Sequence, residues 1–191
     1  MKIWFNDALV DAQSDFLAAD NWPEGFGVFE TIRTQNGQVF ELARHMRRAA
    51  NAAKNFEINL PSEDQIRGAI EALLKASPHE LGRLRLLFSA DRFVAVHQSY
   101  AEITKPAKLK VINEDELVDS IAFKTFPYNH RTELLHSAQS EGYDEIICVN
   151  ERGEVTEGAV SNFLFCIDGD WVTTPLSAGV LPGVQRAIVI E

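Results

Sequence analysis

Hydrophobic and polar positions along this 191-residue chain follow two periods, and the changes of period predict where helices and strands lie. Apolar residues at alternate positions indicate strands, whereas apolar residues three and four positions apart indicate amphipathic helices. In the first half of the chain, the pattern predicts strands over residues 1–10, 25–40, 82–89, 93–99 and 107–112. It also predicts a helix over residues 41–56 and a second helix that begins at Ser62 and ends before Pro78.

Short polar motifs fix some of these boundaries. Asn36-Gly37 has the composition of a two-residue hairpin turn, and it joins Glu30–Arg33 to Gln38–Leu42. Ser62 is followed three residues later by Gln65, which is the sequence pattern of a capping box. The second helix should therefore begin directly after Ser62.

The second half of the chain shows the same mixture of periods. The pattern predicts a strand over 120–125, a helix over 130–141, a hairpin of 144–150 with 153–158, strands over 162–167 and 171–174, and a helix from Gly183. Pro106 and an acidic run beginning at Asn113 indicate a link between domains. Because strands and helices follow one another without a regular crossover pattern, we predict an α+β fold. The predicted domains are 1–112 and 121–191, joined by a linker over 113–120.

Composition excludes some classes of function. The chain has 28 acidic and 18 basic side chains, a formal net charge of −10, which disfavours nucleic acid as a partner. No apolar run approaches the roughly 18 residues of a membrane helix, and the start lacks the apolar stretch of a signal peptide. Cys148 and Cys166 lie in strand-like apolar runs and are predicted to be buried free thiols, as expected of a cytoplasmic protein.

Lys124 lies in an apolar strand and is the strongest candidate for chemistry. A lysine among apolar residues loses hydration, which lowers its pKa and favours the neutral amine that attacks carbonyl groups. Glu157 is a candidate partner for a pyridine nitrogen, and the amides of Val184 and Gln185, after the turn at Gly183, are a candidate phosphate site. These three features match the aldehyde, ring nitrogen and phosphate of pyridoxal phosphate. The structural alternatives are an edge-strand lysine, a solvated hairpin glutamate and an ordinary turn.

Other side chains are candidates because of their surroundings. Arg48 lies beside the apolar stripe of the first helix and is predicted to face inward toward a dianion, whereas Arg47 is predicted to be exposed. Arg85 is a charge inside an apolar strand and needs a carboxylate or a ligand as partner. Thr31 is either ordinary strand filling or a functional hydroxyl. No spacing of ligand residues predicts a metal site.

Six motifs occur in one order along the chain and together resemble a known family. They are Gly25-Phe-Gly-Val-Phe-Glu-Thr-Ile-Arg33, His45-Met-Arg-Arg48, Lys124-Thr125, Gly142-Tyr-Asp-Glu145, Glu154-Val-Thr-Glu-Gly-Ala-Val-Ser-Asn-Phe163 and Leu181-Pro-Gly183. In this order the chain resembles the class IV (fold-type IV) pyridoxal-phosphate enzymes. These include branched-chain aminotransferase, D-amino-acid aminotransferase and 4-amino-4-deoxychorismate lyase.

The resemblance implies a role for each candidate residue. Lys124 would be the Schiff-base lysine that also moves the substrate proton, and Glu157 would pair with the pyridine nitrogen. Arg48 and the amides of Val184 and Gln185 would hold the phosphate. Tyr128 would contact the cofactor's phenolic oxygen, and Asn162 would brace the cofactor site. Arg85 would contact a substrate carboxylate.

The resemblance also implies an activity. Thr31 lies where the lyases carry a threonine that assists elimination, and the run Lys124-Thr-Phe-Pro-Tyr128 is similar to lyase sequences. We therefore expect 4-amino-4-deoxychorismate lyase activity, with an amino-acid transaminase as the alternative. A homodimer is expected because the sites of the family lie near a dimer interface.

The resemblance implies a small N-terminal domain followed by a barrel-like C-terminal domain. Relatives continue beyond the Leu181-Pro-Gly183 turn for longer than this chain does, so the C-terminal domain is expected to be incomplete here. This feature motivates a further alternative, a non-catalytic relative that serves as a binding module.

Overall fold

The computed structural model describes residues 1–12, 24–113 and 123–191, which fall into two compact units. Unit 1 consists of Met1–Glu102 and Lys124–Pro127, and unit 2 consists of Ile103–Phe123 and Tyr128–Glu191. This division differs from the predicted boundary at residue 112. The sequence pattern identifies the strand before that boundary, predicted over 107–112, but not its partner. The partner is the strand Glu145–Val149, which lies in unit 2. Most of the predicted linker, 113–120, lies outside the described residues.

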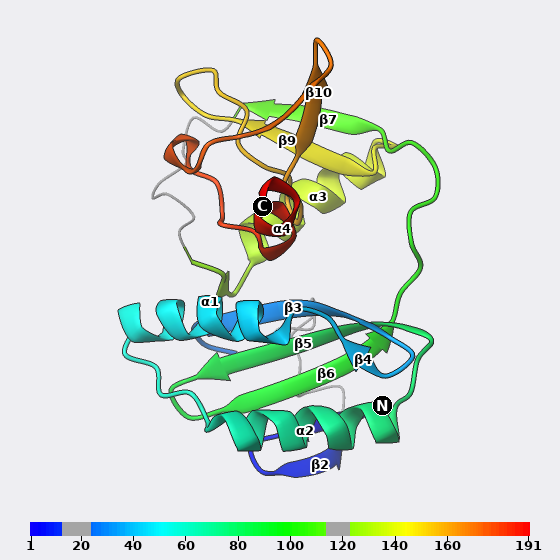
Figure 1. The fold of residues 1–191 in the computed structure, drawn as a ribbon, viewed down its shortest axis with the longest axis vertical. Coiled ribbons are helices and arrows are strands. Elements are labelled where there is room, and N and C mark those ends of the chain that lie inside the picture. Colours follow the sequence, from blue (N-terminus) through cyan, green and yellow to red (C-terminus); the bar gives the residue numbers. More distant parts are fainter. Residues whose placement is uncertain (13–23, 114–122) are drawn as a thin grey trace. The chain divides into compact units, whose positions relative to one another are not determined.

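Unit 1 is built on a seven-stranded sheet (Figure 1). Its order is β2-β1-β6-β5-β3-β4, with β8 also paired to β3. The strands are β1 (Lys2–Phe5), β2 (Ala8–Asp11), β3 (Gly27–Gln35), β4 (Gln38–Val39), β5 (Leu81–Ser89), β6 (Phe93–Ser99) and β8 (Thr125–Phe126). The pairings between these strands are antiparallel. Because β8 pairs with β3, the segment that contains Lys124 is held against the N-terminal sheet.

Two helices cover one face of this sheet, α1 (Leu42–Asn55) and α2 (Glu63–Ala76). α1 packs against β3, and α2 packs against β6, β1 and β2. The strand register places Glu30 and His97 on the same face. Side chains of α1 bond to Glu30, and the carbonyl of Ser77, at the end of α2, bonds to His97. The other face of the sheet therefore remains for different contacts.

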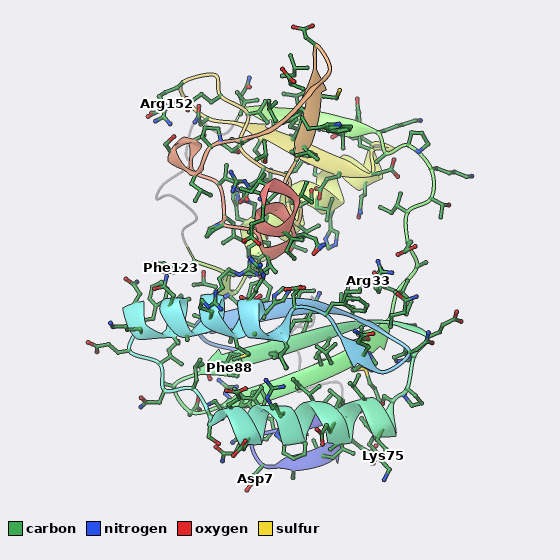
Figure 2. The ribbon with its side chains drawn as sticks, viewed as in Figure 1. Asp7, Arg33, Lys75, Phe88, Phe123 and Arg152 are labelled. Atoms are coloured by element: carbon green, nitrogen blue, oxygen red, sulfur yellow. The ribbon has the colours of Figure 1, made fainter. Side chains whose placement is uncertain are left out.

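The core of unit 1 lies between this sheet and its helices. Strand residues Ile32, Leu84 and Phe88 are at most 1% exposed. Figure 2 shows Phe88 within this layer, whereas Lys75 points outward from α2. Burial of such apolar side chains, about 1.5–3 kcal/mol each, is the main force that holds the helices on the sheet.

Unit 2 contains two small sheets and two helices. β7 (Leu109–Asn113) pairs in parallel with β9 (Glu145–Val149), and α3 (Asn129–Ser140) packs on β9. The buried residues of this core are Ala138, Ile146, Cys148 and Ala159. A hairpin of β10 (Leu164–Ile167) and β11 (Asp170–Thr173) follows, then a 3₁₀ turn (Leu176–Ala178) and α4 (Val184–Ile190).

Several predicted elements are confirmed. Asn36 and Gly37 have φ values of 49° and 80°, as the favoured hairpin turn requires, and Ser62 with Gln65 forms the capping box. The predicted strand 153–158 is reduced to a bridge between Val149 and Val155. The predicted strand 120–125 is described only in part, since residues 114–122 lie outside the described residues.

The two cysteines differ. Cys148 is buried as predicted, but Cys166 is exposed, because β10 forms a sheet with β11 alone and neither strand is deeply covered. Within the described residues, no helix has the length and apolar character needed to cross a membrane.

Candidate active site

Lys124 lies on the face of the unit 1 sheet opposite to the one covered by α1 and α2. The backbone N–H of Phe29 donates to the carbonyl of Lys124 at 2.9 Å, and Lys124 Nζ lies 4.5 Å from the centroid of the Phe29 ring. Side chains two residues apart in a strand point to the same face, so Thr31 shares the face of Phe29. Thr31 is directly opposite Arg85 of β5. The fold thus brings Lys124, Thr31 and Arg85 to one face of one sheet.

Arg85 is a charged side chain in a half-buried position on this face. Burial and the like charge of Arg83 both disfavour the protonated guanidinium and lower the pKa of Arg85 to about 10. Arg85 therefore remains charged at neutral pH, in a setting that favours a nearby anion. This agrees with the prediction that Arg85 contacts a substrate carboxylate, although that role itself stays a prediction.

Arg48 belongs to a buried ionic cluster on the helix-covered face of the sheet. Its Nε and Nη2 donate to Glu30 Oε1 and Oε2 at 2.8 and 2.5 Å, and His45 Nδ1 lies 2.6 Å from Glu30 Oε2. Burial alone would raise the pKa of Glu30, but the hydrogen bonds from Arg48 and His45 lower it below its ordinary value. Arg48 faces inward and Arg47 is exposed, as predicted. In this structure Arg48 therefore pairs with Glu30.

Glu157 is a buried carboxylate of unit 2, only 3% exposed, and not a solvated hairpin residue. Its Oε2 accepts hydrogen bonds from the Leu181 N–H and from Asn162 Nδ2, both at 3.0 Å. On its other side, Arg131 Nη2 lies 3.6 Å from Oε1. Asn162 Nδ2 also lies 3.3 Å from the Leu181 carbonyl oxygen, so Asn162 ties the two segments around Glu157 together.

The loop that follows Glu157 is shaped by a second carboxylate, Glu145. Its oxygens accept from the Ala159 N–H at 3.1 Å and from the Ser161 hydroxyl at 3.0 Å. Gly158 lies so close that a Cβ there would be 2.4 Å from Ser161 Oγ. The Gly-Tyr-Asp-Glu and Glu-Gly motifs therefore act together to fix the backbone beside Glu157.

Tyr128 and the start of α4 complete the predicted residues of unit 2. The Tyr128 hydroxyl donates to the Ala159 carbonyl at 2.9 Å, and burial, reinforced by the charge of Glu157, raises the pKa of this phenol. α4 begins after Gly183 with Val184 buried and Gln185 exposed. Gln185 lines a cavity of about 160 Å³ that also includes Asn162 and Arg186.

The predicted residues are thus divided between the units. Unit 1 holds Lys124, Thr31, Arg85 and Arg48, and unit 2 holds Glu157, Asn162, Tyr128, Val184 and Gln185. Within the described ranges, no group of three or more potential ligand side chains forms a metal site.

Sequence reasoning missed four residues of these networks: Glu30, His45, Arg131 and Glu145. Glu30 carries a readable signal, because, like Arg85, it is a charged residue in an apolar strand. Arg131 carried none, since arginine in the first turn of a helix is ordinarily a surface residue.

The model of the family "Amino-transferase class IV" matches residues 27–191. This chain belongs to the class IV aminotransferase family. Lys124, strand β3 and the motif that carries Glu157 fall within the matched residues, and the predicted family and mixed α+β fold are confirmed.

Members of the class IV aminotransferase family with different names are similar to this chain. An aminodeoxychorismate lyase of Bacillus subtilis is 32% identical over 87% of this chain and 64% of its own length. A putative branched-chain-amino-acid aminotransferase of Methanocaldococcus jannaschii is 25% identical over 100% of this chain and 74% of its own. The chain therefore spans about two thirds to three quarters of the length of these two relatives.

Solved structures of the family have the same fold. A hypothetical aminotransferase from Mycobacterium tuberculosis, in a form titled PLP-bound, matches with a TM-score of 0.83 and 20% identity. The match covers 100% of this chain and 77% of that one. At this identity the likeness establishes the fold.

Proposed function

We propose that this chain forms the pyridoxal-phosphate site of a class IV enzyme whose reaction is the elimination of 4-amino-4-deoxychorismate to pyruvate and p-aminobenzoate. One observation carries the proposal. The pairing of β8 with β3 and of β3 with β5 places Lys124, Thr31 and Arg85 on one face of a rigid sheet. An amine, a hydroxyl and a guanidinium are the groups that such a reaction requires.

Pyridoxal phosphate supplies an aldehyde that takes up the substrate amine and a ring that accepts electrons from the adjacent carbon. The residues that fit this group are those with the matching chemistry. Lys124 offers the amine for the aldehyde, and the buried Glu157 offers a fixed acceptor for a protonated ring nitrogen. Glu157 suits this task because Leu181 and Asn162 hold its Oε2 in one orientation.

The phosphate is assigned to Arg48 and to the amides of Val184 and Gln185. The guanidinium of Arg48 carries the positive charge that a phosphate dianion seeks, and its Nε and Nη2 bond to Glu30. The Glu30 carboxylate also holds the guanidinium in a fixed place, so that little side-chain entropy is lost when an anion arrives. Tyr128 is assigned to the phenolic oxygen of the cofactor.

Lys124 acts first as the covalent anchor and then as the base. Once released, its amine takes the proton from the carbon that bears the substrate nitrogen. Departure of the enolpyruvyl group needs a proton at that group, and the Thr31 hydroxyl is positioned to relay it. Side chains two residues apart on a strand are about 7 Å apart, so Thr31 is about 7 Å from Phe29, beside which Lys124 lies. This separation is within the length of the substrate.

Arg85 supports the choice of a substrate that carries carboxylates. It is directly opposite Thr31, so a carboxylate bound to it would hold the leaving group beside the hydroxyl. A transaminase is the alternative, since one of the relatives is named as a branched-chain aminotransferase. Lys124 would then return the proton to the cofactor. A cytoplasmic homodimer remains part of the proposal.

The test is an assay of the protein supplied with pyridoxal phosphate and 4-amino-4-deoxychorismate. We expect pyruvate and p-aminobenzoate in equal amounts. Thr31→Ala should lower kcat by about a hundredfold or more, whereas Thr31→Ser keeps the hydroxyl and most of the rate. Amino transfer from an amino acid to a 2-oxo acid without release of pyruvate would favour the transaminase. Failure to bind pyridoxal phosphate would favour the non-catalytic binding module.

A further inference from the structure

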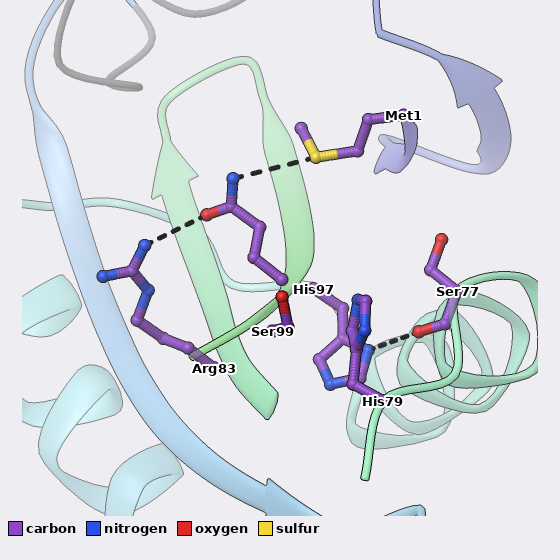
Figure 3. A pocket seen from close by; sticks show the side chains of 7 residues that line it. Met1, Ser77, His79, Arg83, His97 and Ser99 are labelled. Carbon is purple, nitrogen blue, oxygen red and sulfur yellow. Dashed lines mark hydrogen bonds between the residues drawn. The ribbon is translucent and has the colours of Figure 1, made fainter. Parts of the chain in front are cut away.

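The polar side chains around a cavity of about 480 Å³ in unit 1 do not converge on one point (Figure 3). Arg83 Nη2 donates to Gln98 Oε1 at 3.2 Å, and His97 Nδ1 lies 2.7 Å from the Ser77 carbonyl oxygen. The register of β5 with β6 places Arg83 and Gln98 on the face of the sheet opposite to His97. In unit 2, by contrast, two buried charges of opposite sign face each other.

Arg131 is a buried cation in a position that does not favour one. It lies in the first turn of α3, which begins at Asn129, and it is 4% exposed. The first turn of a helix lies at the positive end of the helix dipole, so a cation there is unfavourable. Burial adds the cost of removing the guanidinium from water, which is offset only by well-placed partners. The groups that Arg131 contacts must therefore keep it inside the fold.

Three contacts of Arg131 surround the segment that carries Glu157. Its Nη2 lies 3.6 Å from Glu157 Oε1, and the side chains are 5% and 4% exposed. Its Nη1 donates to Cys148 Sγ at 3.3 Å and to the Gly158 carbonyl at 3.4 Å. The approach to Glu157 is longer than a hydrogen bond and acts through charge, which is only weakly screened between buried groups. Arg131 thus fixes the backbone after Glu157 and places a positive charge beside its carboxyl group.

Glu157 needs such a charge to serve a protonated ring nitrogen. Its Oε2 accepts from the Leu181 N–H and from Asn162 Nδ2, which are both uncharged donors. Burial favours the protonated form of a carboxyl group, whereas a cation within about 4–6 Å favours the ionised form. A protonated ring nitrogen is a donor that pairs best with a charged acceptor, so the ionised form of Glu157 is the one that fits it.

Three other titratable groups share this site: Tyr128 before α3, and Glu145 and Cys148 on β9. Burial, reinforced by the charge of Glu157, raises the pKa of the Tyr128 phenol, so this group is uncharged at neutral pH. Glu145 is a second carboxylate, and its like charge disfavours the ionised form of Glu157. The Cys148 thiol adds no positive charge. Arg131 therefore counters the effects of both burial and Glu145.

We propose that Arg131 is a positioning residue of the cofactor site, whose charge keeps Glu157 ionised so that Glu157 can hold a protonated ring nitrogen. This inference rests on the role proposed above for Glu157. Arg131 acts through Glu157, and its bond to the Gly158 carbonyl keeps the carboxylate in place. By this means unit 2 selects the cationic form of the ring, which is the form that accepts electrons.

The experiment measures the protonation of Glu157 in the full chain without cofactor, by carbon NMR of labelled glutamate carboxyl groups during a pH titration. Glu157→Gln identifies the signal by its loss. In the unmodified chain we expect Glu157 to be ionised at neutral pH. Arg131→Gln should raise the midpoint of its titration by about 1–3 pH units, whereas Arg131→Lys keeps the charge and should raise it less. Arg152→Gln is the matched control, because it removes the same charge from an exposed pair with Glu154 and should leave the midpoint unchanged.

The link to the ring nitrogen is measured by binding. Arg131→Gln should lower the affinity for pyridoxal phosphate at neutral pH by about tenfold or more, since each pH unit in the midpoint corresponds to a factor of ten. It should have less effect on an analogue in which carbon replaces the ring nitrogen. Equal losses for the two ligands would overturn the role toward the ring nitrogen.

Two results of the titration would overturn the proposal: a Glu157 that is protonated at neutral pH in the unmodified chain, or the same midpoint in Arg131→Gln and Arg152→Gln. If Arg131→Gln does not fold, judged by its amide spectrum, Arg131→Lys decides. An ionised Glu157 in the folded lysine variant supports the role of the charge. A protonated Glu157, or loss of the fold in this variant too, assigns Arg131 to packing and overturns the proposal.

The titration is independent of the proposed function, because it uses the chain without cofactor. Failure of the unmodified chain to bind pyridoxal phosphate, together with the expected midpoints, would count against the proposed function alone. Binding of pyridoxal phosphate with no effect of Arg131→Gln on the Glu157 midpoint would count against this inference alone.

Discussion

Replacing Glu30 by glutamine tests the ionic cluster that holds α1 on the sheet. The substitution keeps the shape of the side chain but removes the charge that Arg48 and His45 share. Glu30 is fully buried, and the side chain of Arg48 is 13% exposed, so water cannot replace the lost partner. Breaking a buried ion pair by removing one member costs about 3–5 kcal/mol. Because the glutamine oxygen still accepts one hydrogen bond, we expect about 3 kcal/mol.

The assay is amide hydrogen exchange in β3 and α1, which reports the opening of unit 1 separately from unit 2. Glu63→Gln is the matched control. It removes the same charge from an exposed pair with Arg67, whose side chains are 72% and 51% exposed, and such pairs contribute about 0–1 kcal/mol. If Glu30→Gln changed the opening free energy no more than Glu63→Gln, the cluster would not hold the helix.

The dependence on pH gives the same test an internal check. The pKa of Glu30 is lowered in the folded protein from its ordinary value of 4.5, so its ionised form stabilises the fold fully above that value. This contribution is lost as the pH falls below 4.5 through the folded pKa. The difference between the unmodified protein and Glu30→Gln should therefore be largest at neutral pH and narrow in acid. A difference that grows in acid would refute the assignment.

Three further predictions concern unit 1. Arg48→Ala should lower the affinity for pyridoxal phosphate about ten- to a hundredfold in a binding titration, whereas Arg47→Ala should leave this affinity unchanged. Equal affinities in the two variants would show that the inward-facing side of the helix is assigned wrongly. Gly82→Ala places a Cβ 2.1 Å from His97 Nε2 and should lower the free energy of unfolding, measured with denaturant, by about 1–3 kcal/mol or more. In the control Gly68→Ala the new Cβ meets no atom within 4 Å, so the free energy of unfolding should rise by about 1 kcal/mol at most. Burial lowers the pKa of His97 below 6.5, so stability should fall as the pH drops through 6.5, and His97→Gln should lose that slope.

Local patterns predicted much of the fold because their causes are local. The hairpin turn at Asn36-Gly37 and the cap at Ser62 depend on residues within four positions of each other. The partner of strand β7 depends on β9, which is more than thirty residues away, and no pattern within β7 indicates it. The predicted boundary therefore follows β7, whereas the compact units place β7 in unit 2.

In the candidate site, too, features that depend on neighbours in the sequence were predictable, and features that depend on distant segments were not. The neighbours of Lys124 in the sequence indicated an apolar setting, and its place on the sheet followed from the pairing of β8 with β3. Glu157 follows a hairpin turn, which favours a solvated side chain, but it is buried and bonds to Leu181 and Asn162, which are brought to it by tertiary structure. The order of motifs, read as a resemblance, favours a cofactor role for Glu157 over that of a solvated hairpin residue.

The most direct test of the central claim is to find which lysine binds pyridoxal phosphate. The protein is incubated with the cofactor, reduced with borohydride and digested, and the labelled peptide is identified by mass spectrometry. Lys110, which pairs with Glu141, is an internal control for non-specific labelling. We expect one label, on the peptide that contains Lys124, and we expect this label to be lost in Lys124→Arg. A label on another lysine, or no label at a saturating concentration of cofactor, would contradict it.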